Sequence, residues 1–519
     1  MLDVKITGGQ VLDGTGGSPV LLDVGVSGDS ISETGDLSGA PAKLTISAAG
    51  KYVCPGFIDA HSHSDSYLLV EPSAPSKIFQ GITTEVVGNC GASAAPLVGK
   101  YHMPSDWLDK KYPGKWSTVA EYRSLLESVK PAPNVVLLIG HNTLRVGVSG
   151  YENRPLTKPE LEDAKKLLEQ SLDEGGRGFS TGLIYAPAMF APREELVELA
   201  KVAAKKSGIY TSHIRNEGDR LIEAIEEAVS IGRDAGIRVQ ISHLKTTGRR
   251  NWPLVDKALG LIRTARAEGL EVSADRYPYT SSNTDLDVIF PAWAAEGGRE
   301  SVLKRLKNVS DRKRLRAELL KSRSPDYWGT IIVASTSHAD NRKFQGMPLV
   351  KAAEELGLEP VDAMLHLIET DEVRTTAFFS GMSEENMMKI LGEPFVMIGT
   401  DASLRAPTGP LSHDYPHPRA YGSFPKFIRM SLDGKTVSLP EAVRKMTSLP
   451  AEQFRLKDRG TIARGRKADL VVFDPEKLRD VSTYAAPHRL SEGIEHVIVN
   501  GVPTLQSGKL TGNRGGKML

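Results

Sequence analysis

The chain has 519 residues, of which 40% are hydrophobic and 25% are charged. This is the composition of a folded globular protein, and it excludes disorder, collagen and coiled coil as descriptions of the whole chain. Lysine and arginine (65) balance aspartate and glutamate (64), so the chain has no broad basic field for nucleic acid or an anionic membrane. The two cysteines, Cys54 and Cys90, are too few for a disulfide scaffold.

The N-terminus, MLDVKITGGQ, lacks the basic region and apolar core of a signal peptide. The longest apolar runs are too short to span a bilayer. We therefore expect a cytoplasmic protein whose thiols stay reduced and available to bind metal.

Both ends of the chain have the pattern of short strands broken by turns. The first fifty residues contain DVKITGG and LLDVGVSGDSI, and the last sixty contain KADLVVFDP and EGIEHVIVNGV. Each end offers too few strands for a stable sheet of its own. We predict one small β-sandwich domain built from both termini, over residues 1–54 and 455–519.

The middle of the chain alternates short apolar strands with amphipathic helices. The helix Pro159 to Glu174, for example, begins with a capping box of Thr157 and Glu160. Eight such strands favour an α/β fold, a (β/α)₈ barrel over residues 55–454, with a doubly wound open sheet as the alternative. The predicted strands are Tyr52–Asp59, Thr83–Val87, Asn134–Gly140, Arg177–Gly182, Gly208–Ser212, Ile237–Ser242, Glu271–Asp275 and Phe395–Gly399.

Residues 290–345 break this alternation with a stretch dense in lysine and arginine. We interpret them as a subdomain inserted between the seventh and eighth strands. A solvated pair of charged helices is a simpler explanation of the charge than a binding patch, and the subdomain is a candidate lid.

The strongest local motif is PGFIDAHSHSD, in which His61 and His63 follow the first barrel strand. Residues two apart in a strand face the same side, so both imidazoles can reach one metal ion. A single such pair is weak evidence, because surface histidine pairs occur by chance. It becomes strong when further ligands end other strands of the barrel.

Four further residues with metal-binding or acidic side chains end other predicted strands. They are Cys90 after the second strand, His213 after the fifth, His243 after the sixth and Asp401 after the eighth. The carboxyl ends of barrel strands meet at one face, where active sites of such barrels lie. Imidazole and thiolate together favour zinc.

The remaining histidines are weaker candidates. His141 follows a strand but suits a hydrogen-bonding scaffold equally well. The others divide into surface or packing residues (His102, His366, His488, His496) and loop residues that could line a pocket (His338, His413, His417).

PGFIDAHSHSD together with the later strand-end ligands resembles the amidohydrolase superfamily over nearly the whole chain. The motifs GITTEVVGNCGASAAP, GFSTGLIYAP, TSHIRNE, ISHLK, DRYPYTSS and HPRAYGSFPK resemble the D-aminoacylases, the N-acyl-D-amino-acid deacylases. Other branches of the superfamily use a carboxylated lysine on strand four. The fourth strand here, RGFSTGL, has no lysine, and the thiolate of Cys90 can supply the bridging negative charge.

The resemblance implies zinc-dependent hydrolysis of N-acyl-D-amino acids. It implies that Cys90 and His213 hold the tighter zinc, and that His61, His63 and His243 define a second, weaker position that shares Cys90. It makes Asp401 the catalytic carboxylate, which takes the proton of the attacking water and delivers it to the leaving nitrogen.

The resemblance also implies that Lys245, Arg419 and one tyrosine bind the α-carboxylate of the substrate. The tyrosine is either Tyr277 or Tyr279, and Tyr277 is favoured. The stretch from Asp401 to Arg419 is longer than in the best-known members, which leaves the side-chain preference and the reach of Arg419 open.

The alternative functions are a related amidohydrolase acting on D-terminal dipeptides, N-acyl-D-acidic amino acids or cyclic amides, and a catalytically inactive scaffold barrel. The expected partner is a small-molecule substrate, with neither nucleic acid nor membrane, and the sequence leaves the oligomeric state open.

Overall fold

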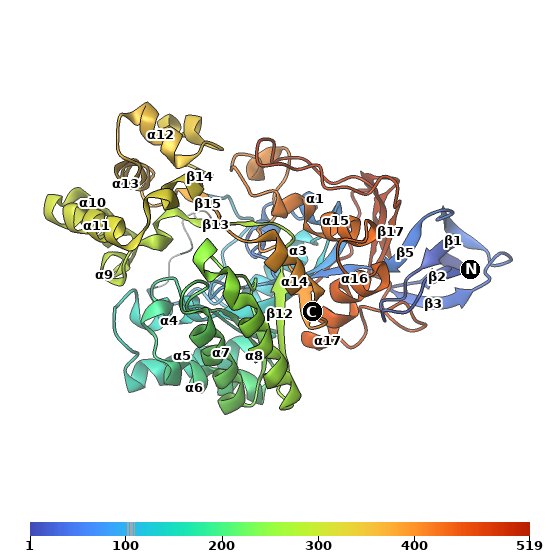
Figure 1. The fold of residues 1–519 in the computed structure, drawn as a ribbon. Helices are drawn as coiled ribbons and strands as arrows, with labels where there is room; N and C mark the ends of the chain where they lie inside the picture. Colours follow the sequence, from blue (N-terminus) through green and yellow to red (C-terminus); the bar gives the residue numbers. More distant parts are fainter. Residues whose placement is uncertain (101–102, 104–106, 108) are drawn as a thin grey trace.

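The computed structural model describes residues 1–100, 103, 107 and 109–519 (Figure 1). His102 lies outside the described residues. In Figure 1 the N-terminal strands occupy one end of the molecule, the barrel lies in the centre, and helices α9 to α13 project from the opposite end.

The centre is an eight-stranded parallel sheet whose strands follow chain order. The strands are β6 (Phe57–Asp59), β7 (Ile82–Val87), β8 (Asn134–Gly140), β9 (Gly178–Gly182), β10 (Ile209–His213), β11 (Arg238–Ile241), β12 (Val272–Arg276) and β16 (Val396–Ile398). The first and last strands meet where the Ala60 amide donates to the Ile398 carbonyl at 3.2 Å and the Asp401 amide donates to the His61 carbonyl at 2.8 Å. This closure confirms the barrel over the open sheet.

Helices cover the outside of the barrel, as the alternation predicts. They are α1 (Pro75–Ile78), α3 (Val119–Val129), α4 (His141–Ser149), α5 (Lys158–Asp173), α6 (Arg193–Lys205), α7 (Leu221–Ala235), α8 (Val255–Ala267), α14 (Glu384–Gly392), α15 (Arg419–Leu432), α16 (Leu439–Met446) and α17 (Ser448–Gln453). Helix α5 begins with the predicted capping box, in which Thr157 and Glu160 satisfy each other's amides.

Strands from both termini form one nine-stranded sheet, which confirms the β domain shared by the two chain ends. Its strands are β1 (Leu2–Val11), β2 (Val20–Ser27), β3 (Ser30–Gly35), β4 (Ala42–Ser47), β5 (Tyr52–Pro55), β17 (Leu470–Phe473), β18 (Ile494–Val499), β19 (Val502–Gln506) and β20 (Lys509–Leu510). The long strand β1 pairs with β4 over its first half and with β5 at its end, so the sheet branches there and encloses a core of its own. The boundaries 54/55 and 454/455 stay a prediction.

The first predicted barrel strand, Tyr52–Asp59, divides between the two sheets. Strand β5 pairs with β17 in the nine-stranded sheet, whereas β6 pairs with β7 in the barrel. Gly56 alone separates them, and an added Cβ there would lie 2.1 Å from Thr83 Oγ1. The run is apolar on both sides of Pro55 and Gly56, so its pattern does not indicate that the two halves join different sheets.

The predicted insertion lies within a longer excursion between β12 and β16, over residues 281–380. This excursion contains a three-stranded antiparallel sheet in the order β13-β15-β14. Its elements are β13 (Ser281–Asp285), α9 (Ala292–Ala295), α10 (Gly298–Lys307), α11 (Val309–Ser322), β14 (Ile331–Val333), α12 (Leu349–Leu356), α13 (Pro360–Thr370) and β15 (Thr376–Ser380). Residues of this excursion bury a separate apolar core, which includes Trp328, Phe344 and Leu365.

Candidate active site

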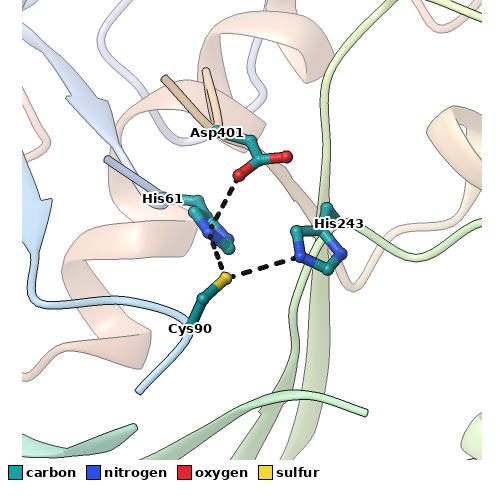
Figure 2. Close-up of side chains that lie close together, drawn as sticks. All are labelled: His61, Cys90, His243 and Asp401. Atoms are coloured by element: carbon teal, nitrogen blue, oxygen red, sulfur yellow. Dashed lines mark hydrogen bonds and ion pairs between the residues drawn. The ribbon is translucent and has the colours of Figure 1, made fainter. Parts of the chain in front are cut away.

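Four side chains from four strand ends converge at the mouth of the barrel (Figure 2). The donor atoms of His61, Cys90, His243 and Asp401 all lie within 4.8 Å of one another. Cys90 Sγ lies 3.3 Å from His61 Nε2 and 3.5 Å from His243 Nε2, and His61 Nε2 lies 3.3 Å from Asp401 Oδ1. The structure thus brings together residues that are up to 340 positions apart in the chain.

The backbone of three of these residues is left-handed. The φ angles are +51° at Cys90, +37° at His243 and +49° at Asp401. Residues other than glycine adopt this region rarely, at a cost of about 1–3 kcal/mol, and such strain clusters at functional sites. It turns each chain sharply just beyond its strand, which directs the side chain into the barrel mouth.

The electrostatics of the cluster favour its anionic forms. Burial alone would raise the pKa of the Cys90 thiol, but the imidazoles of His61 and His243 outweigh it and hold that pKa well below its ordinary value. Burial also opposes ionisation of Asp401, yet the Arg419 guanidinium and the two imidazoles keep the pKa of its carboxyl well below the usual range. A thiolate and a carboxylate beside imidazoles form the ligand set of a divalent cation.

The spacing of the donors fits zinc. Tetrahedral zinc, with bonds of about 2.0–2.1 Å to nitrogen or oxygen and about 2.3 Å to sulfur, places neighbouring ligand atoms about 3.3–3.6 Å apart. Three of the six donor–donor distances, 3.3 and 3.5 Å from Cys90 Sγ to the two imidazoles and 3.3 Å from His61 Nε2 to Asp401 Oδ1, are close to these edges.

His213 and His63 flank the four-residue cluster. His213 Nδ1 lies 2.9 Å from His243 Nε2, and its buried Nε2 has no hydrogen-bond partner among the described residues. His63 Nε2 lies 3.2 Å from Asp401 Oδ1. All five predicted ligands therefore lie together. His61, His243 and Asp401 surround Cys90, and His213 forms a second group with Glu217 and His243. The division of the five ligands between a tighter and a weaker metal position stays a prediction.

A cavity of about 430 Å³ opens onto this cluster. Lys245 and Arg419 both line it, as do residues from the βα loops and from β13 and β15. Arg419 Nη1 donates to Asp401 Oδ2 at 2.6 Å, and Lys245 Nζ contacts Glu217 and His243 Nδ1. The two predicted cations thus reach the site from the segment after β11 and from the start of α15.

The two candidate tyrosines differ in their contacts. Tyr277 is buried, its hydroxyl has no hydrogen-bond partner among the described residues, and the Arg419 guanidinium lies 4.6 Å from its ring centre. The Tyr279 hydroxyl instead donates to Asp480 at 3.3 Å. Neither ring belongs to the described cavity wall, and the free hydroxyl favours Tyr277.

Two carboxylates of the site, Asp275 and Glu217, were not predicted from the sequence. Asp275, at the end of β12, accepts from His61 Nδ1 at 3.1 Å and from the His243 amide at 2.9 Å, and so orients two candidate ligands. Glu217 lies 3.0 Å from His243 Nδ1 and pairs with Lys245. Asp275 ends the seventh strand, so the strand-end pattern could have found it. Glu217 lies in a polar loop and carries no such signal.

Of the remaining histidines, His417 lines the cavity, and the Tyr484 hydroxyl lies 2.9 Å from its Nε2. His141 is buried against Glu195 at 3.0 Å, which supports the scaffold interpretation. His338 and His413 are exposed, whereas His366, His488 and His496 are buried or half-buried on other elements.

No helix in the described part of the chain combines the length and the apolar character needed to cross a membrane.

Comparisons with known proteins agree with this geometry. The amidohydrolase family pattern matches residues 44–253 and 394–505, more than half of the chain, and leaves the excursion unmatched. An N-acyl-D-glutamate deacylase of Alcaligenes xylosoxydans xylosoxydans is 36% identical over 504 residues, which cover 96% of this chain and 93% of the relative. A D-aminoacylase of the same organism is 35% identical over 520 residues, covering 100% and 97%.

A crystal structure of N-acyl-D-glutamate deacylase from Bordetella bronchiseptica, complexed with zinc and a phosphonate mimic of the tetrahedral intermediate, has the same fold. The TM-score is 0.85 at 33% identity, and the alignment covers 100% of this chain and 99% of that one. These similarities extend over both the barrel and the sheet of the two termini. The chain belongs to the amidohydrolase family, and within it to the D-aminoacylases, the N-acyl-D-amino-acid deacylases.

Proposed function

We propose that this protein is a zinc-dependent enzyme that hydrolyses the amide bond of N-acyl-D-amino acids to a carboxylate and a D-amino acid. The observation that carries the proposal is the convergence of His61, Cys90, His243 and Asp401 at the base of a cavity that two cations also line. The D-selectivity is supported by the relatives, which are named for D-amino acids.

Cys90 and His213 would hold the tighter zinc, and His61, His63 and His243 would define a second, weaker position that shares Cys90. Zinc bound there supplies Lewis acidity, which polarises the amide carbonyl and acidifies water. Asp275 holds the His61 ring through Nδ1 and leaves its Nε2 directed at the cluster.

Asp401 moves the proton. Its carboxyl is ionised and lies within 3.3 Å of the imidazoles of His61 and His63, so it can accept the proton of the attacking water. It can then deliver that proton to the leaving nitrogen, because an amine must be protonated to depart. The contact with Arg419 fixes the orientation of the carboxylate during both steps.

Lys245, Arg419 and Tyr277 bind the substrate α-carboxylate. Arg419 offers a planar fork and Lys245 a point charge, and both line the cavity. The Tyr277 hydroxyl is buried and has no hydrogen-bond partner among the described residues, so its O–H is available to donate to the substrate carboxylate. A small acidic substrate suits this cavity, and the balanced charge of the chain gives no broad basic field for nucleic acid.

The test is a substrate panel on protein of measured zinc content. The panel holds N-acetyl-D-amino acids with apolar, acidic and basic side chains, their L-enantiomers, a D-terminal dipeptide and a hydantoin. We expect turnover of N-acetyl-D-amino acids, little of the L-forms and none of the hydantoin. Turnover confined to the hydantoin or the dipeptide would contradict the proposal.

A further inference from the structure

Below the active site, a cluster of buried polar side chains lies at the seam where the barrel closes. We call it the seam cluster. Its members are Asp59 at the end of β6, Lys77 in α1, Glu85 in β7 and Thr400 just beyond β16, and all four are fully buried. None of the four belongs to the residues that line the cavity in the described part of the chain. The proposed mechanism therefore gives the cluster no role.

Thr400 is the member next to Asp401. Its amide donates to Asp59 Oδ1 at 2.8 Å, and its hydroxyl donates to Asp59 Oδ2 at 2.7 Å. The Lys77 ammonium in turn donates to the Thr400 hydroxyl at 2.9 Å and to Asp59 at 2.9 Å. The Thr400 hydroxyl is therefore the side-chain group that contacts both members of the buried ion pair, and the Thr400 amide adds a backbone bond to Asp59.

Lys77 also contacts residues that are adjacent in the sequence to the site residues. It donates to the Ala402 carbonyl at 3.0 Å and to Ser62 Oγ at 3.2 Å, and it pairs with Glu85 at 2.9 Å. Ser62 lies between His61 and His63, and Ala402 follows Asp401. One ammonium group thus ties together the two chain segments that carry the catalytic carboxylate and the histidine pair.

Asp401 needs such support, because its backbone is left-handed at φ +49°. Strained residues persist where the surrounding structure over-determines them. Residues on both sides of Asp401 are fixed by the seam cluster, and the Asp401 amide donates to His61 O at 2.8 Å.

We propose that the Thr400 hydroxyl, held by Asp59 and Lys77, is a positioning group that keeps the strained Asp401 backbone in register with His61 and His63. The kinetic consequence rests on the proposed function, whereas the structural consequence does not. A misplacement of about 1 Å in a reacting group lowers turnover by up to about 100-fold.

The experiment compares Thr400→Val, which removes the hydroxyl, with Thr400→Ser, which keeps it. Thr504→Val is the matched control, because Thr504 is a buried, hydrogen-bonded threonine in β19 of the terminal sheet. Thr400→Val leaves Lys77 with Asp59 and Glu85 as partners, so the ion pair persists. Thr400→Ala removes the hydroxyl with less bulk and replaces Thr400→Val if that variant does not fold.

Two readouts are measured on each zinc-loaded variant. The first is kcat and KM with the best substrate of the panel. The second is backbone hydrogen exchange of peptides that span residues 399–402, which needs no substrate. We expect Thr400→Val to lower kcat about tenfold with KM and zinc content unchanged, and to speed exchange in these peptides. Thr400→Ser should stay close to wild type in both readouts, and Thr504→Val should keep wild-type kcat.

A kcat of Thr400→Val within twofold of wild type, in an active enzyme, would overturn the positioning role. Equal losses in Thr400→Val and Thr400→Ser would assign the effect to packing and not to the hydroxyl. If wild-type protein hydrolyses none of the panel, the proposed function fails. Hydrogen exchange then decides the inference alone, since unchanged exchange in Thr400→Val overturns it.

Discussion

Cys90 contributes the negative charge around which the site is organised. Its sulfur contacts two imidazoles, one beyond β6 and one beyond β11, at 3.3 and 3.5 Å, and its own backbone is left-handed. The other cysteine, Cys54, lies buried in β5, where burial raises the pKa of its thiol. The chain therefore holds one thiol prepared to ionise and one kept neutral.

Substitution of Cys90 by alanine should lower zinc content, because the site loses its thiolate and keeps only neutral imidazoles and one carboxylate near the cation. Metal analysis after dialysis measures the effect. Cys54→Ala is the control and should keep the wild-type zinc content. Equal zinc in the Cys90→Ala variant and wild type would remove Cys90 from the ligand set.

Asp401→Asn should retain zinc and lose turnover by roughly 10²–10⁴-fold, the usual contribution of a general acid–base group. The amide keeps the shape of the side chain but cannot accept the proton of water. Steady-state rates with an N-acetyl-D-amino acid, on protein of measured zinc content, test this expectation. A rate within tenfold of wild type would contradict the proton-transfer role.

At the scale of single elements, helix α16 carries a buried lysine. Lys445 is fully buried and donates to the Glu393 carbonyl, and burial lowers the pKa of its ammonium from 10.5 to about 7. The folded protein therefore releases this proton at a lower pH than the unfolded chain does. Between about pH 7 and 10.5 the unfolded state binds more protons, so this residue makes stability rise with pH.

Lys445→Met removes this pH-dependent contribution. We expect the Tm of wild type, relative to that of Lys445→Met, to increase from pH 7 to pH 9.5, because the wild type no longer buries a charge at the higher pH. Scanning calorimetry of both proteins at the two pH values gives the comparison. A Tm difference that does not change with pH would show that Lys445 keeps an ordinary pKa.

The elements were predictable where local pattern decides them. Seven barrel strands lie within one or two residues of their predicted bounds, because each is a short apolar run between polar residues. The division of Tyr52–Asp59 was not predictable, since sheet membership depends on distant partners. Strand β13 was not predictable either, because its sequence SSNTD is polar and shows no strand pattern.

The site residues, too, were predictable only where a local sequence pattern marks them. Residues that end apolar strands, such as His61 and Asp401, could be found from position alone, because closure of a barrel gathers all strand ends. Glu217 and the seam cluster could not, since their roles depend on pairings across the barrel that no local pattern encodes. A buried Lys77 has the same appearance in the sequence as a solvated one.

At the scale of the whole molecule, the excursion over residues 281–380 supplies part of the cavity wall. Asn283 and Thr284 of β13 line the cavity together with Thr376 of β15, and Arg419 donates to the Asn283 carbonyl at 3.1 Å. The Tyr185 hydroxyl of the barrel lies 2.9 Å from Thr284 Oγ1. We propose that the excursion acts as a lid whose inner face is the β13–β15 ladder.

Binding of a phosphonate analogue of the substrate should slow hydrogen exchange in β13 and β15, because a ligand in the cavity stabilises the wall against opening. Helices α10 and α11 serve as the internal control, since no residue of either belongs to the described cavity wall, and their exchange should not change. Exchange measured by mass spectrometry with and without the phosphonate gives the result. Identical exchange in both ladder strands would contradict the lid.

The single glycine between β5 and β6 sets a limit on how this architecture can be recombined. Gly56 joins the sheet of the two termini to the strand that leads into His61, and Thr83 leaves no room for a side chain at this position. A chimera that grafts this barrel onto the sheet of another family member would place its crossover inside a rigid joint. Such exchanges have to carry Gly56 and Thr83 across together, because a side chain at residue 56 would collide with Thr83.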